Sequence, residues 1–398
     1  MLKGKNILIG ITGSIAAYKM ANVTRMLMKL GADVQIMMTK NSENFIHPLT
    51  LETLSKHKCL IDTFDRNFEY SVEHVSAAQK ADVVLIAPAS ANVIGKLASG
   101  IADDMLTTTV MAAPCTKIIA PAMNHYMYHN PIVQDNLKKL EKFGYIIIPP
   151  EKGMLANGNI GDGRMPSEET LVDYVLKEVA FEKDFAGKKV LVTAGATIEK
   201  IDPVRYITNH STGKMGCAIA KAAMLRGAEV TLVAGSISAE IPPFINVVKA
   251  ESAEDMFDEV TKRQKESDVI IKAAAVADFT PEKTYDEKIK KGNSEFSSIT
   301  LKKTKDILKY LGEHKRENQF ICGFSMETQN VIENSKKKLV SKNADMIAAN
   351  SLKQKGAGFG TDTNIITLIK KDSVNELPVM SKFDAANCIL DEIKKSLD

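Results

Sequence analysis

The chain has few cysteines, and their arrangement excludes the common cysteine-based structures. Among 398 residues there are 5, scattered as Cys59, Cys115, Cys217, Cys322 and Cys388. None forms a Cys-x-x-Cys pair, and none has a histidine partner at zinc-site spacing. We therefore expect neither a disulfide framework nor a structural zinc site, and a reducing, cytoplasmic location fits best.

Long apolar runs and a strong charge imbalance are also missing. No apolar segment approaches the ~20 residues that span a bilayer, so no membrane partner is expected. The formal charge is 52 − 49 = +3 and aromatic residues make up 6%, which does not favour nucleic acid as a partner. Lys3 and Lys5 precede an apolar run as in an export signal, but Thr12-Gly13-Ser14 interrupts that run. A strand entering a glycine turn explains the same residues.

The residues that are present describe a globular chain of two similar halves. Hydrophobic residues make up 44% and charged residues 25%. Residues 7–11 and 190–195 are apolar runs, and each is followed by a helical stretch and a second apolar run. Asp82 and Asp268 precede two further apolar runs that end in small residues and one polar group. Lys189 lies 189 − 5 = 184 positions after Lys5, and Asp268 lies 268 − 82 = 186 positions after Asp82.

This alternation predicts an α/β fold with two doubly wound, Rossmann-like domains. Continuous apolar strands between amphipathic helices indicate parallel sheets covered on both faces. We place the domains at residues 1–180 and 187–398, because the segment 178–188 is polar and suits a linker. Ligands of such sheets bind at the carboxyl ends of the strands, so two separate sites are expected.

In the first half, candidate site residues follow several predicted strands. Gly13-Ser14 lies between a strand and a helix, where free backbone amides can bind phosphate, although an ordinary turn explains the pair equally well. Residues 88–92 and 121–124 end two further strands. The imidazole of His74 suits proton movement near neutral pH, or His74 simply begins a helix. Asn124 fits a helix cap as well as it fits a ligand-binding amide.

Together these segments resemble a known family. Gly13-Ser-Ile-Ala-Ala17, Pro88-Ala-Ser-Ala-Asn92 and Pro121-Ala-Met-Asn124 are similar to signatures of the homo-oligomeric, flavin-containing cysteine decarboxylases. The order of His74, Asn124 and Gly158-Asn-Ile-Gly-Asp-Gly-Arg-Met165 resembles phosphopantothenoylcysteine decarboxylase. The resemblance implies a flavodoxin-like flavoprotein domain that binds FMN through Gly13, Ser14, Thr39, Ser90 and Asn92.

The resemblance also implies a chemistry. A cysteine carboxylate has no electron sink when CO2 leaves, and flavin supplies one by oxidising the thiol. In this scheme His74 assists near the thiol and carboxylate, and Asn124 orients the carboxylate. Where the family has a cysteine before the glycine of its substrate loop, this sequence has Asn157. A carboxamide is neither a usable acid nor redox active, so we expect a slow final step.

The second half carries a longer motif. Thr193–Thr197 follows a strand, and a string that includes Asp202-Pro-Val-Arg205 and Asn209-His-Ser-Thr-Gly213 leads into a helix. Hydroxyl, amide and guanidinium groups at one strand end suit anion binding, although Asp-Pro and Ser-Thr-Gly are also plain turn formers. The whole string resembles phosphopantothenate–cysteine ligase, whose bacterial form uses CTP.

Lysine runs of the second half lie beside predicted strand ends. Such runs are usually solvated faces, but contacts to a triphosphate account for their place here. The resemblance implies a nucleotide site made of Lys272, Ala273, Ala274, Asp278, Lys305, Asp306, Ile307, Leu308, Phe324, Lys338 and Lys342. Lys288 and Mg²⁺ would offset charge as a carboxylate attacks the α-phosphate of CTP, and Arg205 and Asn209 would hold the acyl group. No direct magnesium ligand is assigned.

These assignments predict two consecutive steps of coenzyme A synthesis. CTP-dependent ligation of cysteine to 4′-phosphopantothenate gives phosphopantothenoylcysteine, which FMN-dependent decarboxylation converts to 4′-phosphopantetheine. The partners would be these small molecules and further copies of the chain, as trimers of the flavoprotein halves and dimers of the ligase halves. A flavin reductase or dehydrogenase is disfavoured because no Gly-x-Gly-x-x-Gly follows either first strand. Asn157 favours a further alternative, a ligase whose flavoprotein half has lost decarboxylation and acts as a binding scaffold.

Overall fold

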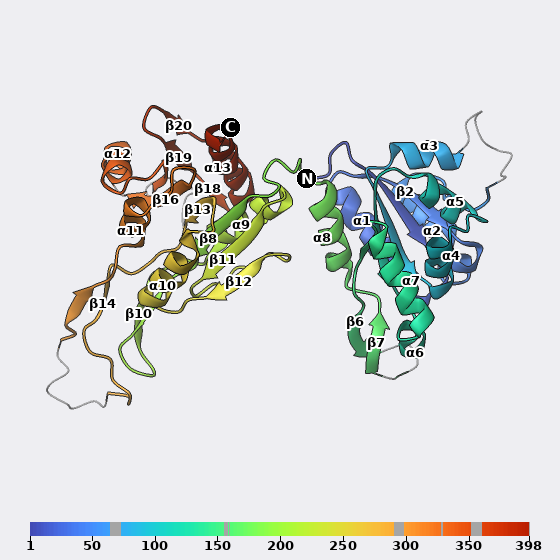
Figure 1. Ribbon diagram of the computed structural model, residues 1–398, viewed down its shortest axis with the longest axis horizontal. Coiled ribbons are helices and arrows are strands. Elements are labelled where there is room, and N and C mark those ends of the chain that lie inside the picture. The colour runs from blue at the N-terminus through green and yellow to red at the C-terminus, as the bar shows by residue number, and fades with distance from the viewer. Residues whose placement is uncertain are drawn as a thin grey trace. The chain divides into compact units, whose positions relative to one another are not determined.

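The computed structural model describes residues 1–63, 73–154, 158, 160–289, 298–327, 329–351 and 360–397. These residues form two compact units, Met1–Phe181 and Glu182–Asp398, each with its own sheet and core (Figure 1). Within the described ranges, no helix is both long and apolar enough to cross a membrane.

The first unit is built on a parallel five-stranded sheet in the order β2-β1-β3-β4-β5. Its strands and a separate hairpin are β1 (Asn6–Ile11), β2 (Asp33–Met38), β3 (Val83–Ala89), β4 (Thr116–Pro121), β5 (Ile146–Ile147), β6 (Glu151–Met154) and β7 (Ile160–Arg164). Its helices are η1 (Ile15–Lys19), α1 (Met20–Lys29), η2 (Lys40–Asn44), α2 (Pro48–Ser55), α3 (Glu73–Lys80), α4 (Ala91–Ser99), α5 (Met105–Ala112), α6 (His125–Tyr128), α7 (Pro131–Lys142) and α8 (Glu168–Val179).

Strand β3 shows why the chain folds this way. All seven of its residues are buried, as a continuous apolar run requires of a central parallel strand. Helix α4 begins directly afterwards, because the Ser90 hydroxyl accepts a hydrogen bond from the Val93 N–H, and it ends at Gly100, which has φ +70°. Helices α4, α5 and α7 share one apolar core with the sheet, while α8 packs on α1.

The second unit is an eight-stranded sheet in the order β12-β11-β8-β13-β16-β17-β19-β20. Its strands, with small two-stranded ribbons, are β8 (Lys189–Ala194), β9 (Ile198–Lys200), β10 (Tyr206–Thr208), β11 (Glu229–Ala234), β12 (Asn246–Lys249), β13 (Val269–Lys272), β14 (Phe279–Pro281), β15 (Leu301–Lys303), β16 (Phe320–Glu327), β17 (Met346–Ser351), β18 (Thr363–Asn364), β19 (Ile366–Ile369), β20 (Val374–Glu376) and β21 (Met380–Ser381). Its helices are α9 (Lys214–Leu225), α10 (Ala253–Gln264), α11 (Ile307–Glu313), α12 (Val331–Ser341) and α13 (Lys382–Leu397).

Both sheets have the doubly wound topology expected from the sequence. Strands β12 to β17 of the second sheet pair in parallel, whereas β19 and β20 run antiparallel at its edge. The parallel part has the strand order of a dinucleotide-binding fold, and the first sheet has the flavodoxin order. The predicted α/β class with two doubly wound domains is therefore confirmed.

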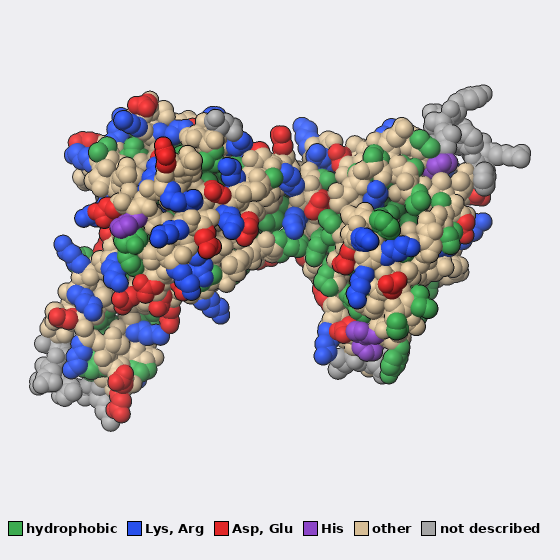
Figure 2. Space-filling view, viewed as in Figure 1, with side chains coloured by type: hydrophobic (Ala, Val, Ile, Leu, Met, Phe, Trp, Pro, Cys, Tyr) green, Lys and Arg blue, Asp and Glu red, His purple; other side chains and the backbone are tan. Residues whose placement is uncertain are grey.

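The internal similarity of the two halves extends to a specific contact. The Asp82 carboxylate accepts a hydrogen bond from the Asn6 N–H at 2.7 Å, and the Asp268 carboxylate accepts one from the Lys189 N–H at 2.8 Å. In each unit, an aspartate that precedes the central strand thus fixes the start of the first strand. On the face seen in Figure 2, Lys and Arg side chains are interspersed with Asp and Glu over both units.

Candidate functional sites

A cavity of about 530 Å³ opens at the carboxyl ends of the strands in the first unit. It lies where the strand order changes direction, between β1 and β3, which is where ligands of such sheets bind. Its lining includes Gly13, Thr39, Ser90 and Asn92, so the fold brings these predicted flavin residues together. Ser14 is not part of this lining, and its hydroxyl accepts a hydrogen bond from the Ala16 N–H at the start of η1.

Hydrogen bonds and close packing shape this cavity. The Thr12 hydroxyl donates to the Pro88 carbonyl at 2.6 Å and accepts from the Ser90 N–H at 2.8 Å, which ties the end of β1 to the end of β3. At Gly13, a Cβ would lie 3.0 Å from the Asn41 Cβ, so glycine allows the two loops to approach closely. The Thr39 hydroxyl is buried and has no hydrogen-bond partner in the described part of the chain. A phosphate group bound there would satisfy it.

The cavity also holds an ion-pair cluster that the sequence analysis had not assigned. Lys96 contacts Asp103 at 2.7 Å and Asp104 at 3.0 Å, and all three line the cavity. The hydrogen bond to Asp103 raises the pKa of Lys96, against the effect of burial. The adjacent carboxylates of Asp103 and Asp104 were the available signal in the sequence.

His74 and Asn124 lie in different parts of the first unit. His74 is half-buried in α3, a helix whose Glu73 and Lys80 line a hollow at the amino ends of the strands, together with Asn6. Asn124 precedes α6, and its side-chain oxygen accepts a hydrogen bond from the Tyr126 N–H at 2.9 Å. The cap predicted as an alternative role for Asn124 is therefore formed. Figure 1 shows α3 and α6 at opposite ends of the unit, so one chain does not bring the two residues together. Asn157 lies outside the described residues.

A cavity of about 350 Å³ lies at the corresponding edge of the second sheet. It gathers most of the predicted nucleotide residues, which come from the end of β13 and from α11 and α12: Lys272, Asp278, Lys305, Asp306, Ile307, Leu308, Lys338 and Lys342. Ala273, Ala274 and Phe324 are not part of its lining. The Ala274 N–H donates to the Thr193 hydroxyl at 3.0 Å, and the Phe324 carbonyl accepts from Lys338 Nζ at 2.9 Å.

The electrostatics of this cavity favour a polyanion. Lys342 Nζ contacts Asp306 at 2.7 Å, and Lys305 Nζ lies 4.8 Å from the centre of the Phe257 ring. Burial and the nearby positive charge of Lys338 together lower the pKa of Lys272 to about 8. Lysines outnumber carboxylates here, so a bound anion would relieve their repulsion.

Arg205 and Asn209 are each held by their own contacts, and those of Asn209 place it beside this cavity. Burial alone would raise the pKa of Asp202, but hydrogen bonds from the Val204 N–H and from Arg205 hold it far below its usual range. The Arg205 guanidinium donates to Asp202 at 2.6 Å and to the Ile289 carbonyl at 2.8 Å, and the exposed Lys288 directly precedes Ile289 in the chain. Asn209 Nδ2 donates to the Ala275 carbonyl at 3.1 Å, directly before the lining residue Val276.

Comparison with known proteins places the chain in a family. Residues 1–180 match the family model "Flavoprotein", and residues 185–397 match "DNA/pantothenate metabolism flavoprotein C-terminal domain". The Coenzyme A biosynthesis bifunctional protein CoaBC of Bacillus subtilis (strain 168) is 47% identical over 397 residues, which cover 99% of this chain and 97% of that protein. The chain belongs to this bifunctional family.

A second full-length relative agrees with this membership. The protein of the same name from Borreliella burgdorferi is 42% identical over 98% of this chain and 99% of its own length. A crystal structure described as the C-terminal domain of CoaBC is 45% identical, covers 54% of this chain and 98% of its own, and superposes with a TM-score of 0.47. The family resemblance drawn from the motifs is confirmed by the full-length match to the bifunctional relatives.

Proposed function

We propose that residues 187–398 ligate cysteine to 4′-phosphopantothenate and that residues 1–180 decarboxylate the product. The chain is a bifunctional enzyme of coenzyme A biosynthesis with ligase and decarboxylase activities, because it matches the bifunctional relatives over its whole length. The assignment of one step to each half rests on the presence of two separate cavities, each at the carboxyl edge of its own sheet.

The five cysteines are all unpaired, which supports a cytoplasmic location.

The first cavity fits FMN. The unpartnered Thr39 hydroxyl and the close approach at Gly13 would hold the phosphate, with Ser90 and Asn92 toward the ring. When bound, flavin supplies the electron sink that decarboxylation of a cysteine requires. The chain's own part is to orient the substrate: Asn124 holds the carboxylate and His74 moves a proton near the thiol.

A second copy of the chain is needed to complete this site. Helices α3 and α6, which carry or adjoin His74 and Asn124, lie at opposite ends of the first unit. The separation supports a site formed between copies, with His74 from one and Asn124 from another. We propose trimers of the flavoprotein halves, with the ligase halves pairing as dimers.

The second cavity fits the triphosphate of CTP. Lys272, Lys305, Lys338 and Lys342 would neutralise phosphate charge, and Mg²⁺, when bound with the nucleotide, would supply further positive charge. Asp278 and Asp306 supply the carboxylates of the cavity, but Asp306 is already paired with Lys342, so most ligands of the ion would be phosphate and water oxygens. Ile307, Leu308, Ala273, Ala274 and Phe324 would contact the nucleoside.

The ligation then proceeds in two steps. The phosphopantothenate carboxylate attacks the α-phosphate of CTP, pyrophosphate leaves, and an acyl cytidylate forms while Lys288 offsets negative charge. The cysteine amine attacks the activated carbonyl and CMP leaves. Arg205, fixed by Asp202, and Asn209 hold the acyl group during this attack.

The test is to supply pure full-length protein with CTP, Mg²⁺, cysteine and 4′-phosphopantothenate. Pyrophosphate and CO2 should both be released, and the protein should carry FMN. Pyrophosphate without CO2 would favour the ligase-only alternative. A parallel assay contains a reduced nicotinamide cofactor as well; its oxidation, with release of neither pyrophosphate nor CO2, would support a reductase and refute the proposal.

A further inference from the structure

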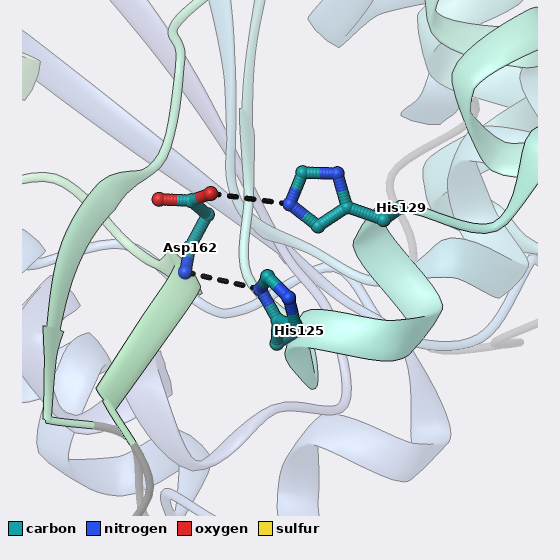
Figure 3. A group of neighbouring side chains, drawn as sticks. All are labelled: His125, His129 and Asp162. Carbon is teal, nitrogen blue, oxygen red and sulfur yellow. Dashed lines mark hydrogen bonds and ion pairs between the residues drawn. The ribbon is translucent and has the colours of Figure 1, made fainter.

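Two histidines and an aspartate converge at one end of the first unit, outside both cavities. His125 and His129 lie one helical turn apart, at the start of α6 and directly after it, and their ring centres are 4.4 Å apart. Asp162 comes from β7, and its carboxylate lies 3.1 Å from His129 Nε2. Figure 3 shows the His129 ring directed at the Asp162 carboxylate and the His125 ring directed at the backbone nitrogen of Asp162. The potential ligand atoms all lie within 4.8 Å of one another.

The backbone holds this group together without the help of an ion. The Asp162 N–H donates to His125 Nδ1 at 3.2 Å, so this nitrogen is unprotonated, and an ion bound to it would replace this hydrogen bond. The Met123 N–H donates to the Gly163 carbonyl at 3.1 Å, which joins β7 to the segment before α6. At Gly161 a Cβ would lie 3.0 Å from the His125 ring, and at Gly163, with φ +125°, it would lie 2.4 Å from the Met123 carbonyl. The two glycines therefore allow the strand to lie directly against the histidines.

We infer that His125, His129 and Asp162 form a binding site for a divalent transition-metal cation of the Zn²⁺ type. Two imidazoles and one carboxylate are ligands that such ions prefer, and they leave coordination positions open for water. Metal–ligand distances are roughly 2.0–2.2 Å, so small side-chain rotations bring the three ligand atoms onto one ion. The His129 and Asp162 side chains are 48% and 39% exposed, which gives an ion access from solvent.

The bound ion would cross-link α6 and β7. Asn124 immediately precedes His125 and caps the same helix, so the ion would fix the position of the β6–β7 hairpin relative to Asn124. Its effect is on the placement of this hairpin, and no chemical step is assigned to it. The sequence analysis considered zinc sites that contain cysteine and did not predict this one. The two histidines of His-x-x-x-His are joined by a third ligand, Asp162, only when a strand 33 residues after His129 folds against the helix.

The first test is a calorimetric titration of Zn²⁺ into the full-length, chelator-treated protein in buffer without phosphate. We expect saturable binding of one ion per chain. His129→Gln and Asp162→Asn should each weaken the binding of Zn²⁺ by more than about tenfold. Loss of a residue that only supports a metal ligand already costs at least about that much affinity, and these two residues would be ligands themselves. The matched control is His57→Gln, which removes a histidine from another exposed pair, with Asp33 at 2.6 Å, and should leave binding unchanged.

Two further measurements use the unmodified protein, so they test the metal site even if a variant fails to fold. Co²⁺ added to the unmodified protein should give an absorption spectrum of low-symmetry nitrogen and oxygen coordination that Zn²⁺ abolishes. Zn²⁺ should also slow amide exchange in residues 125–129 and 160–164 of the unmodified protein. Absence of saturable binding, or full binding by a folded Asp162→Asn variant, would overturn the site and leave an ion pair between His129 and Asp162.

Discussion

Lys272 is the residue for which the structure predicts opposite effects on stability and on ligand binding. Burial, together with the positive charge of Lys338, lowers its pKa from 10.5 to about 8. At 1.36 kcal/mol for each pH unit, holding the charged ammonium there at pH 7 costs about 3 kcal/mol in the nucleotide-free protein. Lys272→Met keeps the length of the side chain and removes the charge. We therefore expect the free energy of unfolding of the second unit to rise by up to about 3 kcal/mol at pH 7.

The pH dependence provides the decisive signature of this effect. Because the folded pKa lies below the unfolded one, the unfolded state binds more protons between pH 8 and 10.5, and the stability of the unmodified protein rises with pH across that window. The advantage of Lys272→Met should therefore be full below pH 8 and fade toward pH 10.5. Urea unfolding of the full-length protein, monitored by circular dichroism at pH 7 and pH 9.5, measures it. Lys336→Met, on the exposed side of α12, is the control and should change little.

The same substitution should weaken nucleotide binding. Loss of a hydrogen bond to a charged group costs about 1.5–3 kcal/mol, which is roughly a tenfold to hundredfold weaker affinity for CTP. Calorimetric titration with CTP and Mg²⁺ measures this loss. A variant that is destabilised, that gains equally at both pH values, or that binds CTP normally would refute the reasoning.

The other predictions concern single polar groups. Thr39→Val should weaken FMN binding about tenfold to a hundredfold by fluorescence titration, without destabilising the flavin-free protein, because the buried hydroxyl has no partner in the described chain; Thr53→Val, on an exposed hydroxyl of α2, is its control. Asn209→Asp should abolish amide formation but leave FMN content unchanged, because a carboxylate repels a phosphate-bearing substrate and an acyl oxyanion; normal product formation by mass spectrometry would contradict this. Asn157→Cys should speed flavin reoxidation in anaerobic stopped-flow turnover, and equal rates in both proteins would show that Asn157 does not limit the reaction.

Much of the fold could be predicted because a buried parallel strand requires a run of consecutive apolar residues, and such runs are visible in the sequence. β3 is apolar at every position, and Asp82 and Asp268 mark equivalent places in the two sheets. Residues at strand ends, such as Gly13 and Ser90, were therefore placed together by topology alone: carboxyl ends of parallel strands meet at one edge.

Contacts between remote elements could not be predicted in the same way. The sequence shows Arg205 as a cation in an anion-binding motif, but not that Asp202 and the Ile289 carbonyl hold its guanidinium. The charge of Arg205 is balanced by Asp202, so the ion pair produces little electrostatic potential beyond contact distance. Arg205 is therefore better suited to orient an acyl oxygen that it contacts than to attract a distant phosphate. The attraction of the triphosphate then falls to the lysines of the second cavity. In particular, Lys272 lies half-buried at the end of β13 where it lines this cavity, and the apolar strand around it in the sequence does not show that burial lowers its pKa.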